Sequence, residues 1–65
     1  MTRMMWQREW DRLRAMEQHA FRKAEAAERE LALSEAPDAR LERRFHTLWQ
    51  VAAEAEAARV AFEAA

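Results

Sequence analysis

Apolar residues recur along the chain at alternating spacings of three and four, which is the period of one face of an α-helix. The pattern occupies two segments and is symmetric about Glu35 and Ala36, next to the only proline. Counted outward from that point, apolar residues pair by position in five layers: Leu31 with Leu41, Ala27 with Phe45, Ala24 with Leu48, Ala20 with Ala52, and Trp10 with Phe62. The pattern therefore predicts an all-α fold, a coiled-coil-like antiparallel two-helix hairpin.

Local signals set the boundaries of the two predicted helices. The expected single domain, residues 1–65, divides into helix 1 at about 2–33, a turn at 34–36, and helix 2 at about 37–63. Thr2 is the predicted N-cap of the first helix, because its hydroxyl can accept a free backbone N–H. Pro37 fits the first position of the second helix, where a missing N–H costs nothing. Asp38 would then lie in the first turn, where the helix dipole favours a carboxylate.

The apolar surface is wider than one helix–helix seam. Four large apolar residues fall on the positions that flank the predicted core: Met16, Phe21, Trp49 and Val51. A hairpin cannot cover both of its flanks, and a chain of 65 residues has little core of its own. We therefore expect a homodimer or higher oligomer, with two hairpins forming a four-helix bundle. The alternative is a monomer with scattered apolar surface residues.

Two charged residues interrupt the apolar stripes. Glu17 would face Ala55, and Arg59 would face Leu13 one layer away. An arginine side chain can bridge one helical turn, so one hypothesis is an ion pair that fixes the register of the hairpin. The alternative is that both side chains extend to the rim and reach water.

The N-terminal segment is unusually rich in methionine and tryptophan. Its cluster comprises Met1, Met4, Met5, Trp6 and Trp10. By the mirror pattern, Trp6 would pair with a residue just beyond Ala65, so the second helix is expected to stop short of covering it. Methionine and tryptophan together are typical of adaptable contact surfaces. The cluster predicts a surface that binds another protein or a second copy of the chain.

Composition excludes several kinds of site. The chain has no cysteine and no glycine, which excludes disulfides, thiolate metal sites and glycine-rich phosphate loops. His19 and His46 lack the Glu-x-x-His spacing of bundle metal sites. We expect no enzymatic activity, cofactor or metal. No segment has the apolar length that spans a bilayer, so we expect a cytoplasmic protein without membrane contact, and the Ala, Arg and Glu content is typical of bacterial or phage proteins.

The favoured function is therefore a small non-enzymatic protein–protein interaction module of the adaptor, inhibitor or co-chaperone type. The expected shape is similar to that of Rop-type dimeric hairpins and of small helical-hairpin co-chaperones of secretion systems, although no sequence motif connects them. The alternative is a Rop-like nucleic-acid-binding regulator that uses its basic side chains: Arg8, Arg12, Arg22, Lys23, Arg40, Arg43 and Arg44. Acidic residues are interleaved with these cations and the net charge is −1, which favours the protein partner.

Overall fold

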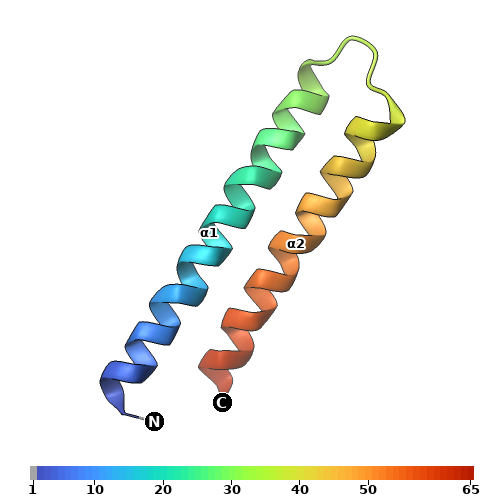
Figure 1. The fold of residues 1–65 in the computed structure, drawn as a ribbon. Coiled ribbons are helices and arrows are strands. Elements are labelled where there is room, and N and C mark those ends of the chain that lie inside the picture. The colour runs from blue at the N-terminus through green and yellow to red at the C-terminus, as the bar shows by residue number, and fades with distance from the viewer. Residues whose placement is uncertain (1) are drawn as a thin grey trace.

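The computed structural model describes residues 2–65 and forms an antiparallel hairpin of two helices (Figure 1). Helix α1 spans Arg3–Leu33 and helix α2 spans Ala39–Ala64. The hairpin measures 52 × 14 × 12 Å, so it is a single layer of two helices. Both termini lie at one end, called the open end here, and the loop of residues 34–38 forms the turn end. Met1 of the predicted N-terminal cluster lies outside the described residues.

Polar side chains cap the start of each helix. Thr2 is the N-cap of α1, and its Oγ1 accepts the backbone N–H of Met5 at 3.2 Å. Asp38 is the N-cap of α2, and its Oδ1 accepts the backbone N–H of Leu41 at 3.0 Å. Residues 34–36 do lie in the turn, but the turn extends to Asp38, so the predicted start of helix 2 at about Pro37 is two residues too early.

The physical reason lies in the capping chemistry of the loop. Pro37 precedes the N-cap instead of occupying the first helical position, because the carboxylate of Asp38 satisfies a free N–H that the methyl group of Ala36 cannot satisfy. The connection between the helices is consequently two residues longer than predicted. Helix α2 ends at Ala64, one residue beyond the predicted end.

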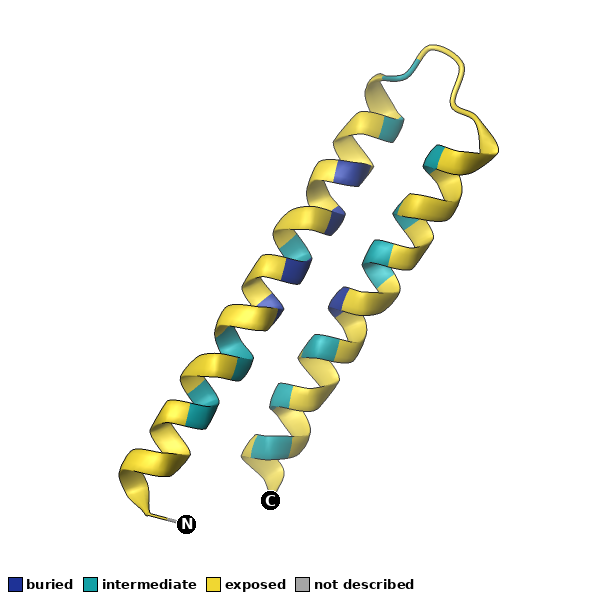
Figure 2. Cartoon of the chain, in the orientation of Figure 1, coloured by how far each residue is buried: buried dark blue, intermediate teal, exposed yellow. Residues whose placement is uncertain are grey.

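Alanines form the centre of the contact between the helices (Figure 2). Ala20, Ala24 and Ala27 of α1 are buried, as is Ala52 of α2. Small side chains at the contact let two helices approach closely. Larger side chains pack around this centre, and none of the large apolar side chains among the described residues is fully buried. The core is consequently thin.

The predicted stripes lie on the facing sides of the helices. Every stripe position except Trp6 is buried or half-buried: Trp10, Leu13, Glu17, Ala20, Ala24, Ala27 and Leu31 in α1, and Leu41, Phe45, Leu48, Ala52, Ala55, Arg59 and Phe62 in α2. The described residues contain two helices and no strand, so the predicted all-helical, two-helix architecture is confirmed.

Candidate functional site

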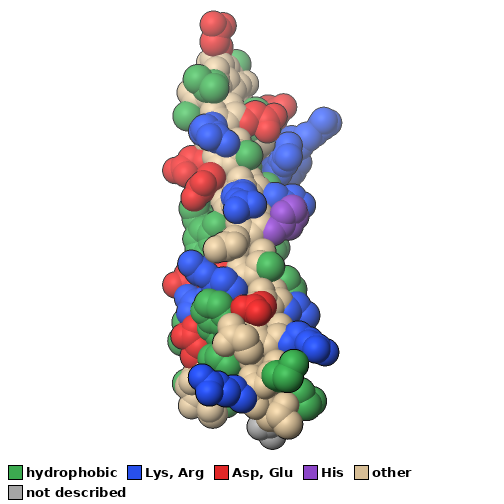
Figure 3. All heavy atoms as spheres, turned by 90° about the vertical axis from the view of Figure 1, so that its left-hand side faces the viewer, with side chains coloured by type: hydrophobic (Ala, Val, Ile, Leu, Met, Phe, Trp, Pro, Cys, Tyr) green, Lys and Arg blue, Asp and Glu red, His purple; other side chains and the backbone are tan. Residues whose placement is uncertain are grey.

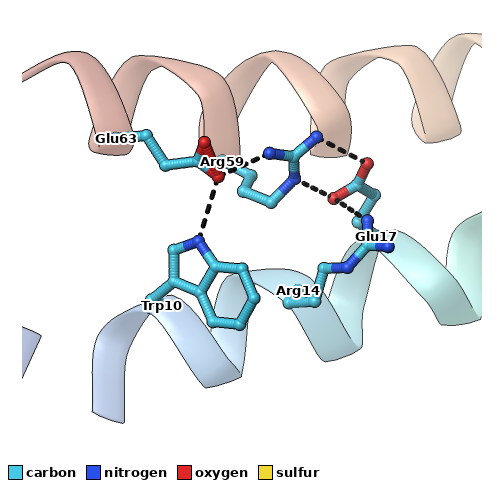
Figure 4. A network of polar contacts seen from close by, with 5 residues as sticks. All are labelled: Trp10, Arg14, Glu17, Arg59 and Glu63. Atoms are coloured by element: carbon cyan, nitrogen blue, oxygen red, sulfur yellow. Dashed lines mark hydrogen bonds and ion pairs between the residues drawn. The ribbon is translucent and has the colours of Figure 1, made fainter. Parts of the chain in front are cut away.

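A network of polar side chains crosses the hairpin between its centre and its open end (Figure 4). Glu17 is only 4% exposed, and Arg59 of α2 donates to both of its carboxylate oxygens. The contact from Nη2 of Arg59 to Oε1 of Glu17 measures 3.3 Å. Arg14, one turn earlier on α1, adds a donor at 3.1 Å from Oε2. The buried carboxylate is therefore paired, and it does not extend to the rim as the alternative hypothesis held.

The same network continues to the open end. Arg59 also pairs with Glu63, and Oε1 of Glu63 accepts the indole N–H of Trp10 at 3.0 Å. Sequence reasoning did not single out Arg14 or Glu63. The sequence does contain a sign of their role. Arg14 lies three residues before Glu17 and Glu63 lies four residues after Arg59, and residues at these spacings share one helix face.

The pKa shifts within the network keep its two carboxylates and Arg59 ionised. The hydrogen bond from Arg59 lowers the pKa of Glu17, against the opposing effect of desolvation, and Arg14 lowers it further. Hydrogen bonds from Trp10 and Arg59 lower the pKa of Glu63. The bond to Glu17 in turn raises the pKa of Arg59. Acid–base catalysis needs a group that titrates near the operating pH, whereas these shifts move each group away from neutrality. The network ties the helices together.

The open end carries exposed methionines beside a stacked aromatic pair. Met4 is 73% exposed and Met5 is 58% exposed. The ring of Trp6 stacks on Phe62 of α2, with the ring centroids 5.3 Å apart and the planes at 29°. Phe62 of α2 thus covers one face of the Trp6 ring, although helix 2 was expected to leave it uncovered, and Trp6 remains 37% exposed. The mirror pattern places Trp6 about one helical turn beyond Phe62, and the two long aromatic side chains bridge that distance along the helix axis.

A shallow hollow opens next to this aromatic pair. It has a volume of about 500 Å³ and is lined by Trp6, Gln7, Trp10 and Glu63. Trp10 is held in place by its hydrogen bond to Glu63, and Trp6 by its stacking on Phe62. The open end consequently combines fixed aromatic side chains with exposed methionines.

The two flanks of the helix contact differ from one another. On one side, here called the aromatic flank, Phe21 and Phe45 pack edge-on against Trp49, with ring centroids 5.7 and 6.4 Å from it. The indole N–H of Trp49 is buried there without a hydrogen-bond partner. Met16 and Val51 remain exposed on a separate groove. Of the four predicted flank residues, two thus pack on each other within the chain and two stay open.

The predicted nucleic-acid face is only partly free. All seven of its basic residues are exposed, but Arg12 pairs with Glu9, and Arg44 pairs with Glu30 at 3.3 Å. Figure 3, which views the outer side of α1, shows Lys and Arg interleaved with Asp and Glu. A continuous basic surface does not form on this side of the hairpin.

Comparison with known proteins gives no match to a protein family, a curated protein or a solved structure, so the site is interpreted from its geometry alone. Within residues 2–65, no three His, Asp or Glu side chains converge to hold a metal ion, and His19 and His46 are both exposed. In the same range, neither helix is both long and apolar enough to cross a membrane.

Proposed function

We propose that the chain is a non-enzymatic protein–protein interaction module, a self-associating helical hairpin whose open end binds an apolar segment of another protein. The single observation that supports this most is the exposure of Met4 and Met5 beside the stacked pair of Trp6 and Phe62. The binding surface is here called the methionine end and comprises Met4, Met5 and Trp6.

The chemistry of the methionine end suits protein recognition. Methionine side chains are flexible and polarisable, so they adapt to irregular apolar surfaces. Tryptophan contributes a large rigid contact area and is enriched among the residues that dominate binding energy. Adaptors, inhibitors and co-chaperones all act by binding another protein, and an apolar surface of this kind is suited to that role.

The polar network stabilises the part of the hairpin that carries the methionine end. Glu63 of α2 accepts the indole N–H of Trp10, which joins the ends of the two helices, and Arg59 on α2 holds the same carboxylate. A surface that is already ordered before binding loses less conformational entropy when the partner arrives. The network therefore favours binding without taking part in it directly.

The test is to capture the partner and then measure its affinity for matched variants. A photo-crosslinking residue at Met4 in the source cells identifies the contacting protein, which is then purified for titration. Trp6→Ala should weaken its binding about 30-fold, the equivalent of about 2 kcal/mol for a dominant contact. Leu33→Ala is the control, because Leu33 is also an exposed apolar residue, 83% against 37% for Trp6, and it lies at the turn end.

Two results would contradict the proposal. One is equal affinity of the Trp6→Ala and Leu33→Ala variants for the captured protein. The other is that the chain binds mixed RNA or DNA in a steeply salt-dependent manner that Trp6→Ala leaves unchanged. That outcome would favour the regulator hypothesis, in which Arg40, Arg43 and the other exposed cations contact phosphates.

A further inference from the structure

A second apolar surface lies away from the methionine end, on the flank opposite Trp49. It is a groove of about 220 Å³, here called the Met16 groove, lined by Met16, His19, Ala20, Lys23, Leu48, Val51 and Ala55. Both helices contribute to it, and Met16 and Val51 are its exposed large apolar side chains. Within residues 2–65, their packing leaves Met16 52% exposed and Val51 46% exposed.

The total surface of the hairpin indicates how much of it is left uncovered. The chain exposes 5250 Å² at a mass of 7.7 kDa. A compact folded monomer of that mass exposes about 4,300 Å², so the hairpin has an excess of about 900 Å². The excess arises because a single layer of two helices leaves both flanks open. It is close to the area of about 800 Å² that each partner buries in a stable protein interface.

Charge distinguishes the Met16 groove from the aromatic flank. Positions seven residues apart lie on one side of a coiled-coil helix. The positions in register with Met16 and Val51 hold two acids and two bases: Glu9, Glu30, Lys23 and Arg44. A balanced flank can meet a copy of itself without like-charge repulsion.

The aromatic flank has the opposite character. The positions in register with Trp49 on α2 are all acidic: Glu42, Glu56 and Glu63. On α1, Arg14 and Glu28 lie in register with Phe21 and cancel one another. A two-fold contact that laid α2 on α2 through this flank would bring Glu42 and Glu56 of the two copies together. Among the described residues, only Glu63 of this row pairs with an arginine of its own chain, so the like charges of the other two disfavour self-association there.

We propose that the Met16 groove is the self-association surface, covered by the same groove of a second copy of this chain across a two-fold axis. This inference rests on the self-association in the proposed function and assigns it to one flank. A two-fold contact uses the same patch on both copies, so Met16 and Val51 of each copy would fill the groove of the other.

Sedimentation equilibrium of matched variants tests the surface. Val51 is 46% exposed and Val60 is 50% exposed, and nine residues of helix separate them, which places them on opposite sides of α2. The wild-type chain and Val60→Lys should both be dimers at micromolar concentration. Val51→Lys should raise the dimer dissociation constant at least about tenfold. A folded wild-type monomer, or equal weakening by the two variants, would overturn the proposal.

Cysteine cross-linking covers the case in which Val51→Lys fails to fold. The chain has no cysteine, so a single introduced thiol reports on its own position. Val51→Cys should form a covalent dimer rapidly with a short bismaleimide linker and should keep the helical content of the wild type. Val60→Cys gives the rate of chance collisions. Equal rates for the two thiols would overturn the proposal.

The methionine end provides the means to separate this inference from the proposed function. Trp6→Ala should leave the dimer dissociation constant within about threefold of the wild-type value, because Trp6 lies outside the groove. If no partner protein binds the methionine end while the Val51 results hold, the proposed function fails and the assignment of the groove stands. If Trp6→Ala dissociates the dimer as strongly as Val51→Lys, the assignment of the groove fails.

Discussion

At the scale of single residues, Glu17 is the side chain most dependent on the hairpin being closed. It is the only charged residue buried among those described, and donors from both helices satisfy its carboxylate. Removing one partner of a buried ion pair leaves an uncompensated charge, which costs far more than the loss of an exposed pair. Sliding one helix against the other would separate Glu17 from Arg59, so the pair is suited to hold the register.

The lowered pKa of Glu17 predicts a dependence of stability on pH. A carboxylate with a lowered pKa in the folded state stabilises that state above its ordinary pKa of 4.5, and the contribution is lost as the pH falls through the folded-state value. The melting temperature of the wild-type chain should therefore fall on acidification below about pH 4.5. Glu17→Gln should melt lower than wild type at pH 7.

Circular dichroism melts between neutral and acidic pH measure this effect. The difference in melting temperature between wild type and Glu17→Gln should shrink as the pH falls, because protonation removes the charge that the variant lacks. The melting temperature of Glu17→Gln should still depend on pH to some extent, because the pKa of Glu63 is also lowered. A constant difference at every pH would show that the charge of Glu17 does not contribute to stability.

At the scale of the helices, the close alanine contact determines how the hairpin packs. Ala52 is fully buried against α1, whereas its neighbour Ala53 is exposed. Ala52→Leu should lower the free energy of unfolding by about 1–3 kcal/mol, because the added methylenes have no space between the helices. Ala53→Leu is the matched control and should change it by less than about 0.5 kcal/mol. Equal effects in urea denaturation would contradict the observed facing sides.

The apolar pattern was sufficient to predict the helices and their facing sides, because helical spacing alone decides which residues share a stripe. It could not place the start of α2, where two capping arrangements around Pro37 and Asp38 competed locally. It also could not predict that Trp6 reaches Phe62, or that Phe21 packs on Trp49. Those contacts depend on side-chain rotamers and length, which periodicity does not specify.

At the scale of the whole molecule, the hairpin has two surfaces of different character. The methionine end is supported by the polar network and projects exposed apolar side chains beyond it. The Met16 groove lies along one flank, and its surrounding charges are balanced. Use of one surface for self-association would leave the other free for a partner, so that a dimer would present two methionine ends.

The melting temperature of the full chain, measured over a hundredfold range of protein concentration, tests most directly whether the hairpin is completed by association. Folding coupled to association makes the melting temperature depend on concentration. We predict that the melting temperature rises steadily with concentration and that the Val51→Lys variant melts lower at every concentration. A melting temperature that stays constant across the whole range, in a chain that is fully helical at the lowest concentration, would contradict the account.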